Sequence, residues 1–218
     1  MPTDGPSTHV SPVRQHPVET PRCVKNDVAR ASAQASGQMS LSSLLDPHRR
    51  WMRLALQEAE RAFEAGEVPV GAVVVRGGQV VGRGHNQVER LEDPTAHAEM
   101  IAVSAACQTL GTKTLAGCTL YVTLEPCPMC AGALVWSKLD RLVFGAFDEK
   151  AGAASTLYDI PRDGRLNHQL ETVSGVEAEA AADLLRAFFR QRRAEAAPRR
   201  APAVGDGAPG EPPPHRPA

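Results

Sequence analysis

A histidine, a glutamate and two cysteines carry the most distinctive chemistry of this 218-residue sequence. His97 and Glu99 stand in the run DPTAHAEM, and Cys127 and Cys130 follow in the run TLEPCPMC. Two cysteines three positions apart lie on one face of a helix, so both sulfur atoms can bind the same ion. One imidazole and two thiolates suit zinc, and three protein ligands leave a fourth position for water. The pattern therefore predicts a catalytic zinc site with one ion per subunit.

Glu99 is predicted to carry protons and not to bind the metal. It lies two residues after His97, which is about 200° round a regular helix. Bound zinc lowers the pKa of water to about 7, and a nearby carboxylate can move a proton from that water to a leaving group. Cys127 and Cys130 could instead form a thiol redox pair or half of a structural zinc ribbon. The sequence has no second CxxC motif, and neither alternative needs the His-x-Glu pair.

Hydrophobic periodicity predicts the elements that position these residues. Asp46 followed by Pro47 is typical of a helix start, and apolar residues then recur at helical spacing as far as Gly66. The run VPVGAVVVRGGQVVGRGHN contains two β-branched stretches around Gly77 and Gly78, which predicts a β-hairpin.

The rest of the core alternates between helices and strands. We expect a loop over residues 86–96, helices over 98–110, 126–138 and 176–193, and strands over 119–123, 141–146 and 170–175. Strands separated by single helices need right-handed crossovers and parallel neighbours. The sequence therefore predicts an α/β fold with three α/β/α layers and a mixed sheet of about five strands. Its first hairpin is antiparallel, and we expect one antiparallel edge strand.

Composition separates this core from two tails. Residues 1–45 are rich in Ser, Pro, Thr and Gln, and residues 196–218 in Pro, Gly and Ala, so both are predicted to be disordered around one domain over residues 46–195. The formal net charge of -1 does not decide whether a nucleic acid binds. No apolar run reaches the roughly 18 residues of a membrane helix, so we expect a cytoplasmic protein without a membrane partner.

The motifs H-x-E and P-C-x-x-C resemble the signature of the zinc-dependent nucleobase deaminases, in the cytidine and deoxycytidylate deaminase superfamily. The runs VPVGAVVV, DPTAHAEM, TLYVTLEPCPMCAGAL and FGAFDEKAGAASTLYDI are similar to those of bacterial tRNA-specific adenosine deaminases, over about residues 51–193. Members of that family have a cytidine-deaminase-like fold, act as homodimers and convert the wobble adenosine of an arginine tRNA to inosine. The resemblance implies that His97, Cys127 and Cys130 bind zinc, that Glu99 is the proton shuttle and that a tRNA anticodon loop is the partner.

The resemblance also implies a set of substrate contacts. Asn86 is expected to donate or accept a hydrogen bond with the extruded adenosine, and the backbone amide at Ala98 to help read the base. Asp148, Asn167 and His168 resemble family positions near the anticodon loop.

Phe189 and Arg192, in the run FFRQRR, resemble the terminal helix of the family. Aromatic and arginine side chains offer stacking surface and phosphate contacts to single-stranded RNA. The same run could equally be a buried aromatic pair beside a solvated charged face. The chain departs from the family at Phe147, where a basic residue is familiar, and at Gln87 and Val88, in place of an arginine and a proline.

Two other functions stay open at this point. The same metal cluster serves deaminases of free bases or nucleotides, such as guanine, cytosine or deoxycytidylate, although a histidine as the first ligand counts against free-cytidine enzymes. A non-catalytic RNA-binding subunit could also retain the zinc fold. The presence of Glu99 counts against that interpretation, because a structural metal site does not need an acid beside it.

Overall fold

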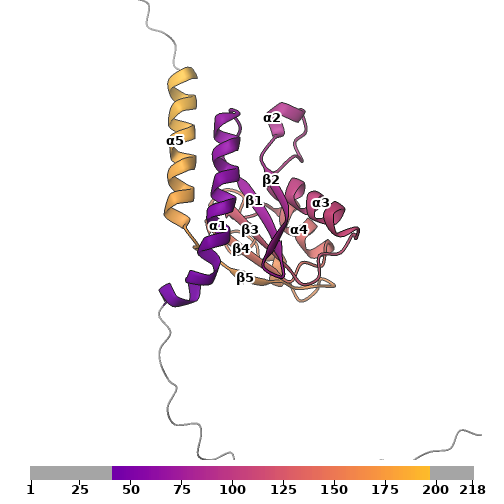
Figure 1. Cartoon of the computed structure of the whole chain (residues 1–218). Helices are drawn as coiled ribbons and strands as arrows, with labels where there is room; N and C mark the ends of the chain where they lie inside the picture. The colour runs from indigo at the N-terminus through magenta and orange to yellow at the C-terminus, as the bar shows by residue number, and fades with distance from the viewer. Residues whose placement is uncertain (1–40, 197–218) are drawn as a thin grey trace, which may run out of the picture. The chain divides into compact units, whose positions relative to one another are not determined.

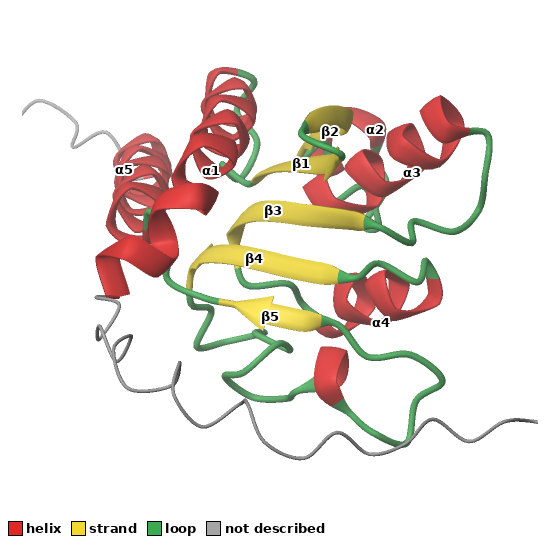
Figure 2. Cartoon of the chain, turned by 60° about the horizontal axis from the view of Figure 1, so that its bottom comes forward, coloured by secondary structure: helices red, strands yellow, loops and turns green. Residues whose placement is uncertain are grey.

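The computed structural model describes residues 41–196, which form a five-stranded sheet with helices on both faces (Figure 1, Figure 2). The predicted tails lie outside the described residues except at their inner ends. The helices are α1 (Leu41–Glu64), α2 (Val88–Leu91), α3 (Ala98–Leu110), α4 (Pro128–Trp136), α5 (Ala178–Ala196) and the short 3-10 helix η1 (Ile160–Arg162). The strands are β1 (Gly71–Arg76), β2 (Gln79–His85), β3 (Cys118–Leu124), β4 (Arg141–Ala146) and β5 (Glu171–Val173).

The strand order is β2-β1-β3-β4-β5, and the sheet is mixed. β1 is antiparallel to both β2 and β3, whereas β3, β4 and β5 are parallel to one another. The predicted α/β fold with an antiparallel first hairpin is therefore confirmed. The expected antiparallel edge strand was wrong, because the strand that opposes the other four is β1, which lies second from the edge. β2 folds back outside it through Gly77 and Gly78, whose φ angles of 55° and 75° favour glycine.

Alternation along β1 produces the two cores of the layered structure. Val73 and Val75 pack with Met52 of α1 on one face of the sheet. Ala72 and Val74 pack on the other face, in a cluster that includes buried residues of α3 and α4. Successive side chains of a strand point to opposite faces, so this run of five buried residues needs cover on both sides. Figure 2 shows α1 and α5 on one side of the sheet and α3 and α4 on the other.

Glycines in β2 let α3 lie unusually close to the sheet. A Cβ atom at Gly82 would lie 2.3 Å from the carbonyl oxygen of Ala102, and one at Gly84 would lie 2.5 Å from that of Ala98. Both distances are too short for any side chain. This close approach fixes the N-terminus of α3, where His97 stands.

Several helix boundaries differ from those predicted. α1 begins at Leu41, so Pro47 is inside the helix and Asp46 is not its N-cap. A proline inside a helix lacks the N–H of the usual hydrogen bond and kinks it, and Figure 1 shows the first turns of α1 at an angle to the rest. The expected loop over residues 86–96 contains the one-turn helix α2. α4 begins at Pro128, with Cys127 as its N-cap, and α5 begins at Ala178.

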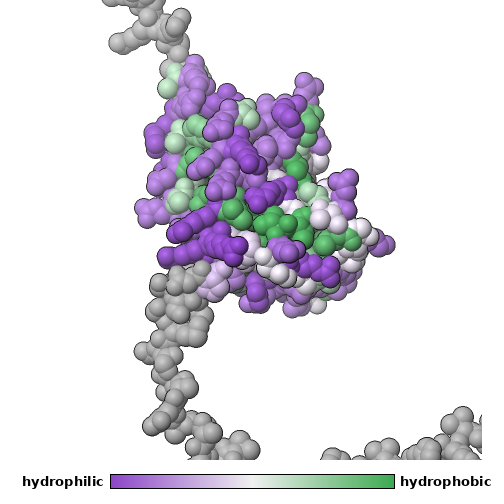
Figure 3. Space-filling model, viewed as in Figure 1, coloured by the Kyte–Doolittle hydropathy of each residue, from purple (hydrophilic) through white to green (hydrophobic). Residues whose placement is uncertain are grey.

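The surface over α1 and α5 is mainly hydrophilic in the view of Figure 3. Both helices are amphipathic and bury only one side against the sheet. In the part of the chain that the structure describes, no helix combines the length and the apolar character that a membrane span requires.

Candidate active site and metal centre

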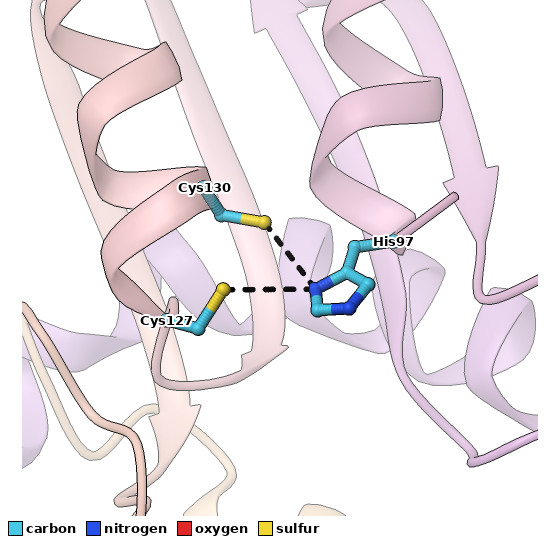
Figure 4. A group of neighbouring side chains, drawn as sticks. All are labelled: His97, Cys127 and Cys130. Atoms are coloured by element: carbon cyan, nitrogen blue, oxygen red, sulfur yellow. Dashed lines mark hydrogen bonds between the residues drawn. The ribbon is translucent and has the colours of Figure 1, made fainter. Parts of the chain in front are cut away.

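The three predicted ligand residues meet at the N-termini of α3 and α4 (Figure 4). His97 is the N-cap of α3, Cys127 is the N-cap of α4, and Cys130 lies in the first turn of α4. Nδ1 of His97 lies 3.7 Å from Sγ of Cys127 and 3.5 Å from Sγ of Cys130. Both caps have extended backbone, which turns their side chains toward each other across the gap between the two helices.

The donor set and its spacing fit a tetrahedral zinc ion. The three ligand atoms all lie within 4.8 Å of one another. In a tetrahedral site with Zn–S of about 2.3 Å and Zn–N of about 2.0 Å, neighbouring ligand atoms are about 3.6 Å apart. Cys130 is fully buried, while His97 and Cys127 are half-buried and leave one side of the group open. The group can therefore hold a metal ion with a ligand position directed away from the protein core.

The two thiols share one proton. A hydrogen bond from Cys130 lowers the pKa of Cys127 to about 4, with a further contribution from His97. The same hydrogen bond and burial raise the pKa of Cys130. One sulfur is thus already a thiolate at neutral pH, and binding of a cation would displace the remaining proton.

Glu99 is buried beside this group, with only 4% of its surface exposed. It lies in the first turn of α3, and its side chain contributes to the same cavity as His97 and Cys127. Burial raises the pKa of Glu99 to about 6. A carboxyl group with a pKa near neutrality can both accept and release a proton.

A cavity of about 500 Å³ opens in front of these residues. It lies beyond the carboxyl ends of β2, β3 and β4, where α/β sheets commonly bind ligands. Besides the metal-binding group and Glu99, its lining comes from the α1–β1 loop, the β2–α3 loop, the β3–α4 loop, the β4–β5 loop and α5. These residues are Gly66, Glu67, Val68, Val70, Asn86, Val88, Glu89, Leu124, Glu125, Asp148, Ala151, Phe188, Phe189 and Arg192.

Four of the predicted substrate-binding residues line this cavity together. They are Asn86, Asp148, Phe189 and Arg192, which come from three different parts of the sequence. Ala98 is fully buried as the first residue of α3 and contributes no side chain to the lining. Its backbone N–H belongs to the first turn, whose amides have no partner within the helix.

Asn167 and His168 lie outside the cavity lining. Nε2 of His168 donates to the carbonyl oxygen of Leu139 at 2.6 Å. Nζ of Lys138 donates to the side-chain oxygen of Asn167 at 2.8 Å. Both residues thus brace the turn that follows α4, and the single chain does not bring them to the His/Cys/Cys group.

The terminal helix contributes one buried and one exposed aromatic ring. Phe188 is 5% exposed and packs edge-on against Phe63 of α1. Phe189 is 45% exposed and lines the cavity. The guanidinium of Arg192 lies 5.5 Å from the ring of Phe188 and donates to the carbonyl oxygen of Gly66. In the run FFRQRR, Phe188 is therefore a buried core residue, as one interpretation predicted. Phe189 is accessible to a ligand, as the other predicted.

The positions that depart from the family lie at or near the same cavity. Val88 lines it, and Gln87 is buried and accepts a hydrogen bond from the side chain of Arg90. Phe147 is 53% exposed and packs edge-on against Phe144. An apolar side chain therefore stands beside Asp148 at the end of β4.

Sequence reasoning missed Glu67, a buried acid in the cavity wall with 1% of its surface exposed. Its Oε2 accepts from Nδ2 of Asn86 at 3.1 Å and from the N–H of Glu89 at 3.2 Å, and its Oε1 accepts from the N–H of Arg90 at 2.8 Å. It therefore joins Asn86 to the start of α2. The signal in the sequence was an acid directly before the apolar run VPVGAVVV.

Glu125 is a second buried acid that sequence reasoning missed, although it stands two residues before Cys127. Its Oε1 accepts from the backbone N–H groups of Ala154, Ser155 and Thr156, at 3.0, 2.8 and 2.9 Å. Its Oε2 accepts from the N–H of Asp148 at 3.2 Å and from the hydroxyl of Thr156. Burial alone would raise the pKa of Glu125, but these hydrogen bonds hold it below its ordinary value. The carboxylate thereby fixes the loop that carries Asp148.

The chain is similar to known deaminases. The profile of the MafB19-like deaminase family matches residues 46–193. The tRNA-specific adenosine deaminase of Bacillus subtilis is 52% identical over 143 residues, which cover 66% of this chain and 89% of the relative. A solved structure from a study of A-to-I editing by tRNA deaminases at the wobble position has a TM-score of 0.60 and 41% identity, and the match covers 62% of this chain and 98% of that chain. A guanine deaminase from Nitrosomonas europaea has a TM-score of 0.57 and 26% identity, over 65% of this chain and 84% of its own.

Proposed function

Since this chain belongs to the family of tRNA-specific adenosine deaminases, within the MafB19-like deaminases, we propose that it deaminates the wobble adenosine of a tRNA to inosine. The observation that carries the proposal is one cavity lined by a His/Cys/Cys group, a buried glutamate and an exposed aromatic and arginine of α5. The first two features serve hydrolysis of an amino group, and the last two suit single-stranded RNA. The arginine tRNA is the first substrate to test.

We propose that His97, Cys127 and Cys130 hold one zinc ion per subunit. Their donor types support this assignment, as do the distances of 3.7 and 3.5 Å from Nδ1 of His97 to the two sulfur atoms. When bound, zinc supplies a Lewis acid that makes water nucleophilic at neutral pH. The N-termini of α3 and α4 favour the thiolate forms of the cysteines, so the fold itself contributes to metal binding.

Glu99 is the proposed proton carrier of the reaction. Its burial beside His97 and Cys127 allows it to take a proton from the attacking water and to deliver one to the departing amino group. Adenosine loses ammonia and gains the oxygen of water, so the glutamate ends the cycle in its starting protonation state. Asn86, which lines the same cavity, is the proposed hydrogen-bonding partner of the base.

RNA contacts are proposed for residues on the outer side of the cavity. Phe189 offers a ring for stacking, Arg192 a cation for phosphate, and Asp148 a carboxylate for ribose or base. The first-turn amide of Ala98 is proposed to read the base. Asn167 and His168 lie outside the cavity, so any contact they make with tRNA must involve the parts of the anticodon arm beyond the extruded nucleotide.

We also propose that the chain forms a homodimer. Trp136, Leu157 and Tyr158 are 75%, 52% and 58% exposed, and exposed apolar surface can mark a site where a partner binds. Light scattering should give twice the mass of the chain, and Trp136→Glu should reduce it. A monomeric mass for the native protein would contradict the proposal. A cytoplasmic location stays a prediction.

The experiment that tests the function is incubation of zinc-loaded protein with an anticodon stem-loop that has adenosine at the wobble position, followed by inosine detection. Glu99→Ala serves as the inert control, and its zinc content should remain one ion per chain. Guanine and deoxycytidylate are tested in parallel, because a guanine deaminase shares the fold. Turnover of a free base or nucleotide with no inosine in RNA would replace the proposal by that rival, and RNA binding without any turnover would favour a non-catalytic subunit.

A further inference from the structure

The contacts of Glu67 dictate the orientation of the amide of Asn86. The backbone N–H groups of Glu89 and Arg90 can only donate, so both oxygens of Glu67 must accept. The amide of Asn86 approaches Oε2 of Glu67, which also accepts from the N–H of Glu89. Only the amide nitrogen of Asn86 can donate to that oxygen. An amide flipped by 180° would place its carbonyl oxygen against a carboxylate oxygen. The nitrogen of Asn86 therefore faces Glu67 for a chemical reason.

This arrangement leaves two groups of the Asn86 amide for a ligand. One N–H is used by Glu67, which leaves the second N–H and the carbonyl oxygen of the same planar amide for a ligand. Among the described residues, no protein group donates to that oxygen, although Asn86 is only 7% exposed. Since Asn86 lines the cavity with Glu99 and His97, its free acceptor and free donor are adjacent groups in a ligand site.

Both residues are held by their backbones as well. The N–H of Glu67 donates to the carbonyl oxygen of Ala62 at 2.9 Å, and the N–H of Asn86 donates to that of Val70 at 3.0 Å. Neither side chain can follow a ligand by a shift of its main chain. The pair therefore presents a fixed pattern of one acceptor beside one donor.

We infer that Glu67 is a positioning residue that holds the Asn86 amide in the orientation that selects a 6-aminopurine. The edge of adenine that carries N6 and N7 offers a donor beside an acceptor, which complements the oxygen and nitrogen of an asparagine amide. The same edge of a 6-oxopurine offers two acceptors, one of which would oppose the asparagine oxygen. This inference rests on the proposed function and adds to it a source of selectivity for adenosine that lies outside the metal-binding group.

The test compares two stem-loops, one with adenosine and one with 7-deazaadenosine at the wobble position. The ratio of kcat/KM for adenosine to kcat/KM for 7-deazaadenosine measures the contact to N7. The same ratio in Asn86→Ala is the baseline, because it reflects only the intrinsic reactivity of the two bases. One neutral hydrogen bond corresponds to about a 2- to 12-fold change, so the native ratio should exceed the baseline by that factor. Glu67→Met, which removes the acceptor but keeps the length, should have the baseline ratio.

Two matched variants separate positioning from stability. Glu67→Gln keeps an oxygen for Asn86 and should retain the native ratio. Glu58→Gln alters another buried glutamate, which is not part of the cavity lining and pairs with Arg61, Arg83 and His85, and it should leave the ratio unchanged even if the protein melts earlier. A merely structural role of Glu67 would lower kcat/KM for both stem-loops by the same factor.

If Glu67→Met has the same kcat/KM ratio for the two stem-loops as the native protein, the inference is overturned. If that variant does not fold, Glu67→Asp is measured in its place, because the shorter side chain withdraws the acceptor from Asn86 by one methylene group. Its ratio should fall toward the baseline, and a native ratio would contradict positioning. Absence of inosine from the native protein would instead refute the proposed function itself.

Discussion

Replacement of Glu125 by glutamine should loosen one wall of the cavity without touching a metal ligand. Glutamine can keep its oxygen toward the N–H groups of Ala154, Ser155 and Thr156, but its NH2 group then faces the N–H of Asp148. An unsatisfied buried N–H costs about 1–3 kcal/mol, and the loss of charge from the remaining hydrogen bonds adds about 1 kcal/mol. We expect Glu125→Gln to lower the free energy of unfolding by about 2–4 kcal/mol.

Thermal unfolding measures this loss directly. For a domain of this size, each kcal/mol shifts Tm by about 2–4 °C, so Tm should fall by about 4–16 °C. Because Asp148 loses its anchor, KM for the stem-loop should rise more than kcat falls, while the zinc content stays at one ion per chain. Glu171→Gln is the control, since Glu171 is 61% exposed and its ion pair with Arg141 should contribute less than about 1 kcal/mol. A Tm within about 2 °C of the native value, or a loss of zinc in place of a rise in KM, would refute this reasoning.

Three further predictions concern the helices and the reacting group. Gly82→Ala should destabilise the fold by about 3 kcal/mol or more in denaturant unfolding, because the added Cβ would meet the backbone of α3. Gly132→Ala has open space within α4 and should stabilise the fold by about 1 kcal/mol. Burial, with a smaller effect of Arg141, lowers the pKa of His48 below 6.5. The neutral imidazole therefore contributes fully to the free energy of unfolding above that pH, and its contribution declines as the pH falls below it. The difference in Tm between pH 7.5 and 5.5 should shrink in His48→Gln, and an unchanged difference would contradict this linkage. Glu99→Gln should lower kcat about 10²- to 10⁴-fold with unchanged zinc by elemental analysis, and near-native turnover would remove Glu99 from the mechanism.

The cysteine pair of the proposed metal-binding group could be predicted from the sequence because its geometry is local. Cys127 and Cys130 are one turn apart at the start of a helix, so their convergence follows from helical spacing alone. His97 joins them because α3 and α4 both begin at the carboxyl ends of the sheet, which the alternation of strands and helices indicates. The same alternation predicts the layers of the fold, but it does not say on which side of β1 the second strand of the hairpin folds.

The walls of the cavity could not be predicted in this way. Glu67 and Asn86 are 19 positions apart, and Glu125 bonds to residues 23 to 31 positions away, so neither contact leaves a period in the sequence. The helix α2 was missed for the same reason. The amides of its second and third residues, Glu89 and Arg90, are satisfied by the carboxylate of Glu67, and the four residues themselves have no strong helical pattern.

The cavity is therefore bounded on two sides by loops that buried carboxylates hold through backbone amides. Glu67 fixes the start of α2 and Asn86 on one side, and Glu125 fixes Asp148 and the loop after it on the other. Hydrogen bonds to a charged acceptor are directional and about twice as strong as neutral ones, so they define a loop conformation more sharply than apolar packing does. The metal ligands have no share in either set of bonds. Affinity for the metal and recognition of the base should consequently vary independently in this fold, which lets substitutions at the walls change the substrate while the hydrolytic group is retained.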